Sequence, residues 1–129
     1  MKLTILALLT ATAVLAQDAY TRAIYTKWKP GMRDQGQQFI KDVAYKASLN
    51  WVKSDPKALG QVTMSRVMPA GNEINYDRLR LIVTNAPPDL AGTPNNLDGI
   101  AMTPAEYSAK LASFMDTVRT EIWQSVGCL

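Results

Sequence analysis

LGQVTMSRVMPAGNEINYDRLRLIVT, residues 59–84, is the stretch on which the predicted fold depends. Within it, residues 61–68 alternate, and Val62, Met64 and Met68 share one face with Arg66. Residues 76–84 also alternate, with an aliphatic face and a mixed face: Leu79, Leu81 and Val83 on the first, Tyr76, Arg78, Arg80 and Ile82 on the second. A period of two is typical of strands, and residues 69–72 (PAGN) are strong turn formers. The stretch therefore predicts two strands joined by a turn, and the Pro-Pro pair at 87–88 ends the second strand.

A strand and a long helix are predicted before this hairpin. Residues 18–29 alternate and are rich in aromatic and β-branched side chains, which favours a strand. Residues 32–53 carry an apolar stripe at helical spacing: Phe39, Ile40, Val43, Ala47 and Trp51. Gly36 weakens this helix near its start by about 1 kcal/mol relative to alanine. Residues 54–56 (SDP) predict its end, because the residue before a proline avoids helical angles.

A loop, a second helix and a fourth strand are predicted after the hairpin. Residues 86–102 are rich in Pro, Gly, Asn and Asp, and we interpret them as a surface connection, with a lid or binding loop as the alternative. Thr103, Pro104 and Glu106 have the spacing of a capping box. The apolar stripe of the helix that they open is Tyr107, Leu111, Phe114, Met115 and Val118. Residues 119–126 alternate and predict a strand, with a continuous helix to Gln124 as the competing interpretation.

The order strand, helix, strand, strand, helix, strand predicts an α+β, ferredoxin-like βαββαβ fold. In this fold a four-stranded antiparallel sheet carries both helices on one face. If Leu79, Leu81 and Val83 face the helices, Tyr76 and Ile82 lie on the open face. Further apolar side chains are expected to extend that open face: Ile24, Trp28, Val62, Met64, Met68 and Ile122 or Trp123. An exposed apolar sheet implies a partner, and the simplest partner is a second copy, giving a homodimer.

The N-terminal residues 1–16 (MKLTILALLTATAVLA) have the pattern of a secretory signal peptide: a positive charge, an apolar run and small residues before a cut. A membrane anchor is the alternative, but the apolar run is short for a span. We therefore expect an exported protein, periplasmic or secreted, whose residues 17–129 form a single domain without a stable membrane span. Cys128 is the one cysteine, so no disulfide within the chain is expected.

Composition limits the chemistry that this chain can perform. The sequence has no histidine, which removes the usual general base near neutral pH and the commonest metal ligand. It also has no phosphate-binding loop and no zinc or calcium motif. Asn95, Asn96 and Asp98 offer oxygen atoms, but they are typical turn residues first. We expect no catalytic residues, no metal and no cofactor. The net charge of +3 comes from scattered basic residues, and no nucleic-acid partner is expected.

The remaining candidate ligand-binding residues are polar and aromatic side chains of the predicted strands: Arg66, Arg78, Arg80, Tyr25, Tyr76, Trp28, Glu121 and Trp123. Arg66 interrupts an apolar strand face, and a buried arginine needs a partner. We favour an ion pair with a glutamate that fixes strand register or an interface. One alternative is an inward arginine that, with aromatic side chains, binds an anionic or planar ligand, and the other is simple solvent exposure.

Three stretches resemble a known group of proteins: YTKWKPGM (residues 25–32), LGQVTMSRVMPAGNEINYDRLRLIV (residues 59–83) and VRTEIWQSV (residues 118–126). With the order of elements, they are similar to the dimeric α/β-barrel superfamily of ferredoxin-like folds. That superfamily includes antibiotic-biosynthesis-type monooxygenases, stress-responsive barrel proteins and NIPSNAP-like proteins. The likeness is greatest to small exported bacterial members of unassigned activity. The resemblance implies a homodimer built on the sheet and supplies no catalytic signature.

These observations lead to one functional expectation and two alternatives. We expect an exported dimeric domain that binds a small aromatic or anionic ligand, or that acts as an interaction module. The first alternative is a cofactor-independent monooxygenase-like enzyme, which such folds support without a metal. The second is a structural subunit of a surface assembly, because an antiparallel sheet leaves free edges.

Overall fold

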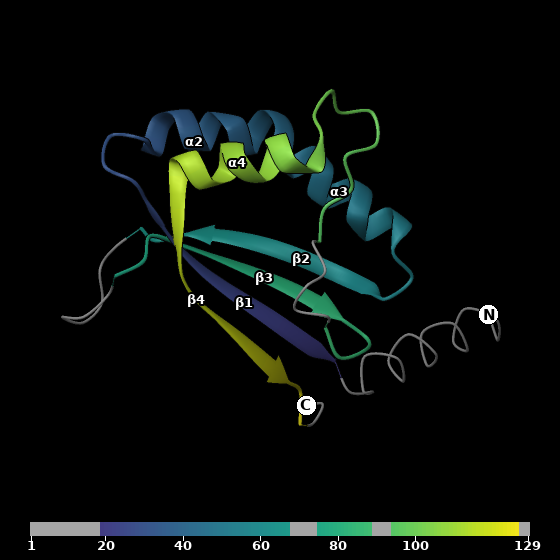
Figure 1. Ribbon diagram of the computed structural model, residues 1–129. Coiled ribbons are helices and arrows are strands. Elements are labelled where there is room, and N and C mark those ends of the chain that lie inside the picture. Colours follow the sequence, from purple (N-terminus) through teal and green to yellow (C-terminus); the bar gives the residue numbers. More distant parts are fainter. Residues whose placement is uncertain (1–18, 68–74, 89–93, 127–129) are drawn as a thin grey trace, which may run out of the picture.

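The computed structural model describes residues 19–67, 75–88 and 94–126 (Figure 1). Its elements, in chain order, are β1 (Tyr20–Trp28), α2 (Arg33–Phe39), the π-helical segment η1 (Ile40–Ala44), α3 (Tyr45–Ser54), β2 (Ala58–Ser65), β3 (Arg78–Thr84), α4 (Pro104–Phe114) and β4 (Met115–Gln124). The proposed signal peptide, the predicted turn at residues 69–72, Met68 and Cys128 lie outside the described residues. Within the described part of the chain, no helix is long and apolar enough to cross a membrane.

The four strands form one antiparallel sheet in the order β2-β3-β1-β4. The central strands β1 and β3 pair in continuous register from Tyr20 opposite Thr84 to Thr26 opposite Arg78. Figure 1 shows the helices on one side of this sheet and its other face uncovered. This is the predicted α+β, ferredoxin-like arrangement, so the fold class is confirmed.

The first helical region matches the prediction for residues 32–53 closely. It runs from Arg33 to Ser54 through the π-helical segment, and Asp55 ends it with extended backbone angles. Its apolar stripe packs on α4, and the core between them is built on three buried residues: Ala44, Ala47 and Tyr107. Phe39 contacts Tyr107 and Phe114 with ring centroids 5.9 and 5.6 Å apart. The core therefore lies largely between the helices.

The second helix begins as predicted and ends earlier than predicted. The Thr103 hydroxyl accepts a hydrogen bond from the Glu106 N–H at 3.2 Å and donates one to the Glu106 carboxylate at 3.1 Å, so both residues of the capping box are engaged. The helix ends at Phe114, and β4 begins at Met115 without a connecting loop. Met115 and Val118 thus belong to β4 and not to the helical stripe, and the alternative of a helix to Gln124 is wrong. β4 pairs with β1 from Met115 onward, and this pairing accounts for the early change to strand.

The orientation of the hairpin is opposite to the one that we considered from the sequence. Ile82 and Thr84 are buried, and Arg80 reaches Ser48 on α3, so the mixed face of β3 lies toward the helices. Because side chains alternate, Leu79, Leu81 and Val83 face away from them. Ile24 and Trp28 also lie on the helix side, because Ile24 is paired with Arg80 and the Trp28 ring abuts Gly36. Ile122, opposite Arg22, shares that side, whereas Val62, Met64 and Trp123 lie on the open face as expected.

The described part of the long loop, residues 94–102, is docked on the helices. The Asn96 N–H donates to the Ala47 carbonyl, and the Asn50 amide donates to the carbonyls of Asn96 and Asp98. Leu97, Ile100 and Met102 pack against the helical core. These contacts hold Pro94 and Asn95 at the edge of the space between sheet and helices.

Candidate functional site

Polar side chains line the inner face of the sheet, where a small domain ordinarily places its apolar residues. Antiparallel pairing sets Gln61, Ile82 and Arg22 in one cross-strand row, and Thr63, Arg80 and Ile24 in the next. The third row contains Ser65, Arg78 and Thr26. Arg78 and Arg80, two residues apart on β3, therefore point in the same direction, toward the helices.

A cavity of about 580 Å³ lies between this face and the helices. Its apolar wall comes from both layers: Ile24, Ile40, Ala44, Leu111, Ala112 and Met115. Its polar wall includes Arg22, Arg78, Arg80, Ser48, Gln61, Asn95 and Tyr107. Several other lining residues are exposed (Tyr45, Thr63 and Ser108), so the cavity opens to solvent. Its size falls within the range of small-molecule sites, roughly 300–1,000 Å³.

Arg80 is held in place by neutral oxygen atoms from three parts of the chain. Its Nε donates to Gln61 Oε1 at 2.9 Å, and its Nη2 donates to Ser48 Oγ and to the Pro94 carbonyl, also at 2.9 Å. Asn95 Oδ1 lies 3.4 Å from the same Nη2. Burial lowers the pKa of Arg80 to about 10, and the neighbouring charges of Arg78 and Arg22 act in the same direction. The side chain is still a cation at neutral pH.

Arg78 has a different set of contacts. Its Nη1 donates to the Met115 sulfur at 3.5 Å, a weak acceptor. Burial lowers the pKa of Arg78, and burial raises the pKa of Tyr107, whose ring lies across the cavity on α4. The two arginines oppose that rise in the pKa of Tyr107. Tyr107 is therefore a neutral hydroxyl group beside two guanidinium cations.

Within the described part of the chain, Arg78 and Arg80 are not paired with a carboxylate of the cavity wall. Among the described residues that line it, Asp116 is the one acid, and its side chain is 70% exposed and 3.7 Å from Lys29 Nζ. Buried cations without an opposing charge are costly unless a ligand or partner supplies that charge. Within the described chain, no group of three or more acidic or cysteine side chains is arranged to hold a metal ion. The arrangement thus favours an anion.

The predicted site residues divide between the two faces of the sheet. Arg78 and Arg80 lie together in the cavity. Trp28 lies near it, on the same face, against Gly36. The other five predicted residues lie outside the cavity wall: Arg66, Tyr25, Tyr76, Glu121 and Trp123.

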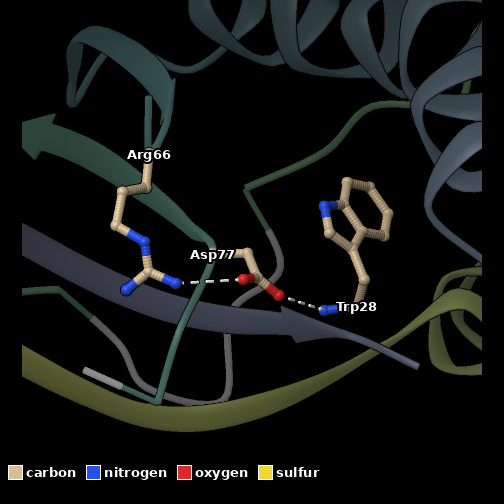
Figure 2. A network of polar contacts seen from close by, with 3 residues as sticks. All are labelled: Trp28, Arg66 and Asp77. Carbon is tan, nitrogen blue, oxygen red and sulfur yellow. Dashed lines mark hydrogen bonds and ion pairs between the residues drawn. The ribbon is translucent and has the colours of Figure 1, made fainter. Parts of the chain in front are cut away.

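Arg66 takes part in a network that ties three strand ends together (Figure 2). Its Nη2 lies 3.2 Å from Asp77 Oδ1, and Asp77 Oδ2 accepts a hydrogen bond from the Trp28 N–H at 3.1 Å. The Arg66 N–H donates to the Asp77 carbonyl, and the Asp77 N–H donates to the Thr26 carbonyl. Arg66 therefore forms an ion pair, as we favoured from the sequence, but its partner is an aspartate and not the expected glutamate.

A row of rings and cations crosses the open face. Arg119 lies over the Tyr25 ring, 4.4 Å from its centroid, and Tyr25 meets Tyr76 edge to face at 4.7 Å. Arg66 lies 5.8 Å from the Tyr76 centroid. A hydrogen bond with Glu121 raises the pKa of the Tyr25 hydroxyl, and Arg119 partly offsets this. These groups stabilise one another on a surface that is otherwise largely apolar.

Several cavity residues were missed as candidates from the sequence. Tyr107 was assigned to the helical core, where it also belongs. Asn95 was considered as an oxygen ligand and set aside as a turn residue, and Ser48 and Gln61 carried no recognisable pattern. Arg22 shares the strand parity of Ile24, which signals a common face, but that parity does not tell which layer the face meets.

No protein-family profile, curated protein or solved structure matches this chain.

Proposed function

We propose that this domain binds a small anionic ligand in the cavity between its sheet and its helices. The observation that supports the proposal is the pair Arg78 and Arg80, two cations directed into a solvent-connected cavity whose one described carboxylate is engaged elsewhere. An anion there interacts with guanidinium groups that are already oriented and partly desolvated, and such hydrogen bonds are stronger than neutral ones.

Calorimetric titration of the purified protein with benzoate and with inorganic phosphate tests this proposal. We expect saturable binding of at least one of these anions and at least a tenfold loss of affinity in Arg78→Met. Arg119→Met is the matched control, because it removes an arginine from the open face, and its affinity should equal that of the wild type. If neither anion binds, or if both variants behave alike, the proposal is wrong.

We also propose that a second copy of the chain covers the open face of the sheet, as in the dimeric α/β-barrel superfamily that the sequence resembles. Support comes from the composition of this face. Val62 is 48% exposed, Met64 44% and Trp123 58%, next to Leu79, Leu81 and Val83. Two of its arginines are paired within the chain, Arg66 with Asp77 and Arg119 with Glu121, which reduces the charge repulsion between two copies.

The oligomeric state tests this second proposal. Light scattering after size exclusion, under reducing conditions, should give twice the mass of the chain. Val62→Glu should give a monomer, whereas Gln37→Glu, the same charge change on an exposed helical position, should leave the dimer intact. A monomeric wild-type protein would refute the proposal, and a ladder of larger species would favour a surface assembly.

Export remains a proposal that rests on residues 1–16. Cleavage after Ala16 predicts that the mature chain begins at Gln17. N-terminal mass spectrometry of the protein recovered from a secretion-competent bacterial host decides this, because retention of Met1 would contradict cleavage.

A further inference from the structure

Arg78 and Arg80, two of the three arginines that line the cavity, differ in how much of their hydrogen-bonding capacity is already used. A guanidinium group has five N–H donors. Arg80 directs its Nε and Nη2 at Gln61, Ser48, Pro94 and Asn95. Arg78, in the described structure, directs one nitrogen at a thioether sulfur. Arg78 is therefore the group able to offer two parallel N–H donors to a ligand, and Arg80 contributes mainly its charge.

The cavity that Arg78 enters has a largely apolar wall, although the neighbours of Arg78 across the sheet are Ser65 and Thr26. Met115 touches its guanidinium, and Ile24, Ile40 and Leu111 line the same cavity from β1, η1 and α4. A compact, strongly hydrated anion leaves these walls in contact with water, whereas an organic molecule covers them. Covering these walls removes apolar surface from water, which favours binding.

We propose that the ligand is a small monocarboxylate with an apolar body, bound with its carboxylate on Arg78 and its body against Ile24, Ile40 and Leu111. The inference rests on the proposed anion site and adds its ligand class. One fork of free donors matches one carboxylate, because guanidinium and carboxylate pair through two parallel hydrogen bonds. The neutral Tyr107 hydroxyl, on the opposite wall, is available as a further hydrogen-bond donor.

Three probes separate the carboxylate from the apolar body. 2-Naphthoate carries both features, 2-naphthamide has nearly the same shape without the charge, and inorganic phosphate is an anion without an apolar body. We expect calorimetry at pH 7 to give 2-naphthoate an affinity at least tenfold higher than either of the other two. In Arg78→Met the preference for naphthoate over naphthamide should shrink to the part that the charge of Arg80 supplies. In Arg78→Lys, which keeps the charge but loses the fork, naphthoate should bind with intermediate affinity.

The possible results distinguish this inference from the function on which it rests. If phosphate binds as tightly as naphthoate and loses its affinity in Arg78→Met, the anion site stands and the apolar-body assignment is wrong. If naphthamide binds the wild type as tightly as naphthoate, the carboxylate assignment is wrong. If no anion binds, the proposed function itself fails. The comparison among probes uses the wild-type protein, so it holds even if a variant does not fold.

Discussion

At the scale of single residues, Gly36 and Gly60 show that glycine occurs in this chain for different structural reasons. From the sequence, Gly36 is a weak point in a helix. In the structure, a β-carbon there would lie 2.9 Å from Trp28 Cε3 and 3.1 Å from Phe114 Cβ, so the missing side chain lets the first helix approach β1 and α4. Gly60 has open space at the corresponding position. Close packing therefore accounts for Gly36 and not for Gly60.

Replacement of Gly36 by alanine should destabilise the protein, although alanine is the better helix former. The gain in helix propensity is about 1 kcal/mol, whereas forcing a side chain into a packed site costs about 1–3 kcal/mol. We expect a net loss in the free energy of unfolding, measured by urea denaturation. Gly60→Ala is the control and should change it little. A more stable Gly36→Ala protein would contradict this account.

A second residue-scale prediction concerns the charge of Arg80 and pH. Its pKa of about 10 keeps it protonated up to that pH, so the affinity for a carboxylate should be constant between pH 6 and 9 and fall above about 10. Calorimetric titration with 2-naphthoate at pH 7, 9 and 10.5 measures this, with circular dichroism to check that the protein stays folded. A decrease already near neutral pH would contradict the assignment.

The shifted pKa values of Arg80 and Tyr107 change the stability of the fold in opposite directions as pH rises, so ligand affinity is the clearer measurement. The unfolded chain keeps the Arg80 proton to higher pH than the folded chain, so this group makes folding more favourable as pH rises from about 10. The raised pKa of Tyr107 means that the folded chain keeps that proton longer, so this group makes folding less favourable as pH rises above 10.

At the scale of elements, Asp77 joins the ends of β1, β2 and β3. It accepts from the Trp28 N–H with one oxygen and meets Arg66 with the other (Figure 2). The ion pair thus also involves a backbone group, the Trp28 N–H, which no sequence pattern indicated. The chain also places Asp77 directly before β3, where its own backbone pairs with Thr26 and Arg66.

Asp77→Ala should therefore destabilise the protein more than Arg66→Met does. Loss of the aspartate leaves the Trp28 N–H without its acceptor, at about 1–3 kcal/mol, whereas a partly exposed ion pair contributes about 0–1 kcal/mol. Asp77→Asn keeps an acceptor oxygen and should lie between the two. Chemical denaturation of the three variants gives the order. Equal losses in Arg66→Met and Asp77→Ala would mean that the ion pair dominates.

The sequence predicts the elements well because each carries a local signal. Alternation identifies the strands, the apolar stripe identifies the first helix, and Thr103 with Glu106 identifies the start of α4. The end of α4 was placed too late, because Met115 and Val118 satisfy a helical spacing. Met115 is a strand residue through its pairing with Trp28, and Val118 lies where the register between β1 and β4 shifts.

The candidate site was predicted in part, and the reason lies in β3. Arg78 and Arg80 were selected, but with six residues that lie outside the cavity wall. Alternation shows that Leu79, Leu81 and Val83 share a face, yet it does not say whether helices or a partner cover that face. From the sequence we considered the case in which the aliphatic face meets the helices, which is the usual arrangement of apolar residues, and this chain has the reverse.

At the scale of the whole molecule, this reversal is the feature from which both proposals follow. The inner face of the sheet is rich in arginine and polar groups beneath the helices, which leaves a cavity in place of a fully packed layer. The outer face carries the aliphatic side chains and is uncovered in the single chain (Figure 1). A ligand in the cavity and a second copy on the outer face would together bury the surface that a lone domain of this size leaves exposed.

The position of a bound ligand tests the central claim most directly. A crystal structure of the protein with 6-bromo-2-naphthoate, with the bromine located by its anomalous scattering, shows where the molecule lies. We predict the bromine in the cavity near Ile24, Ile40 and Leu111, and the carboxylate within hydrogen-bonding distance of Arg78. A bromine on the open face of the sheet, or an empty cavity at a ligand concentration that saturates the protein in solution, would contradict the account.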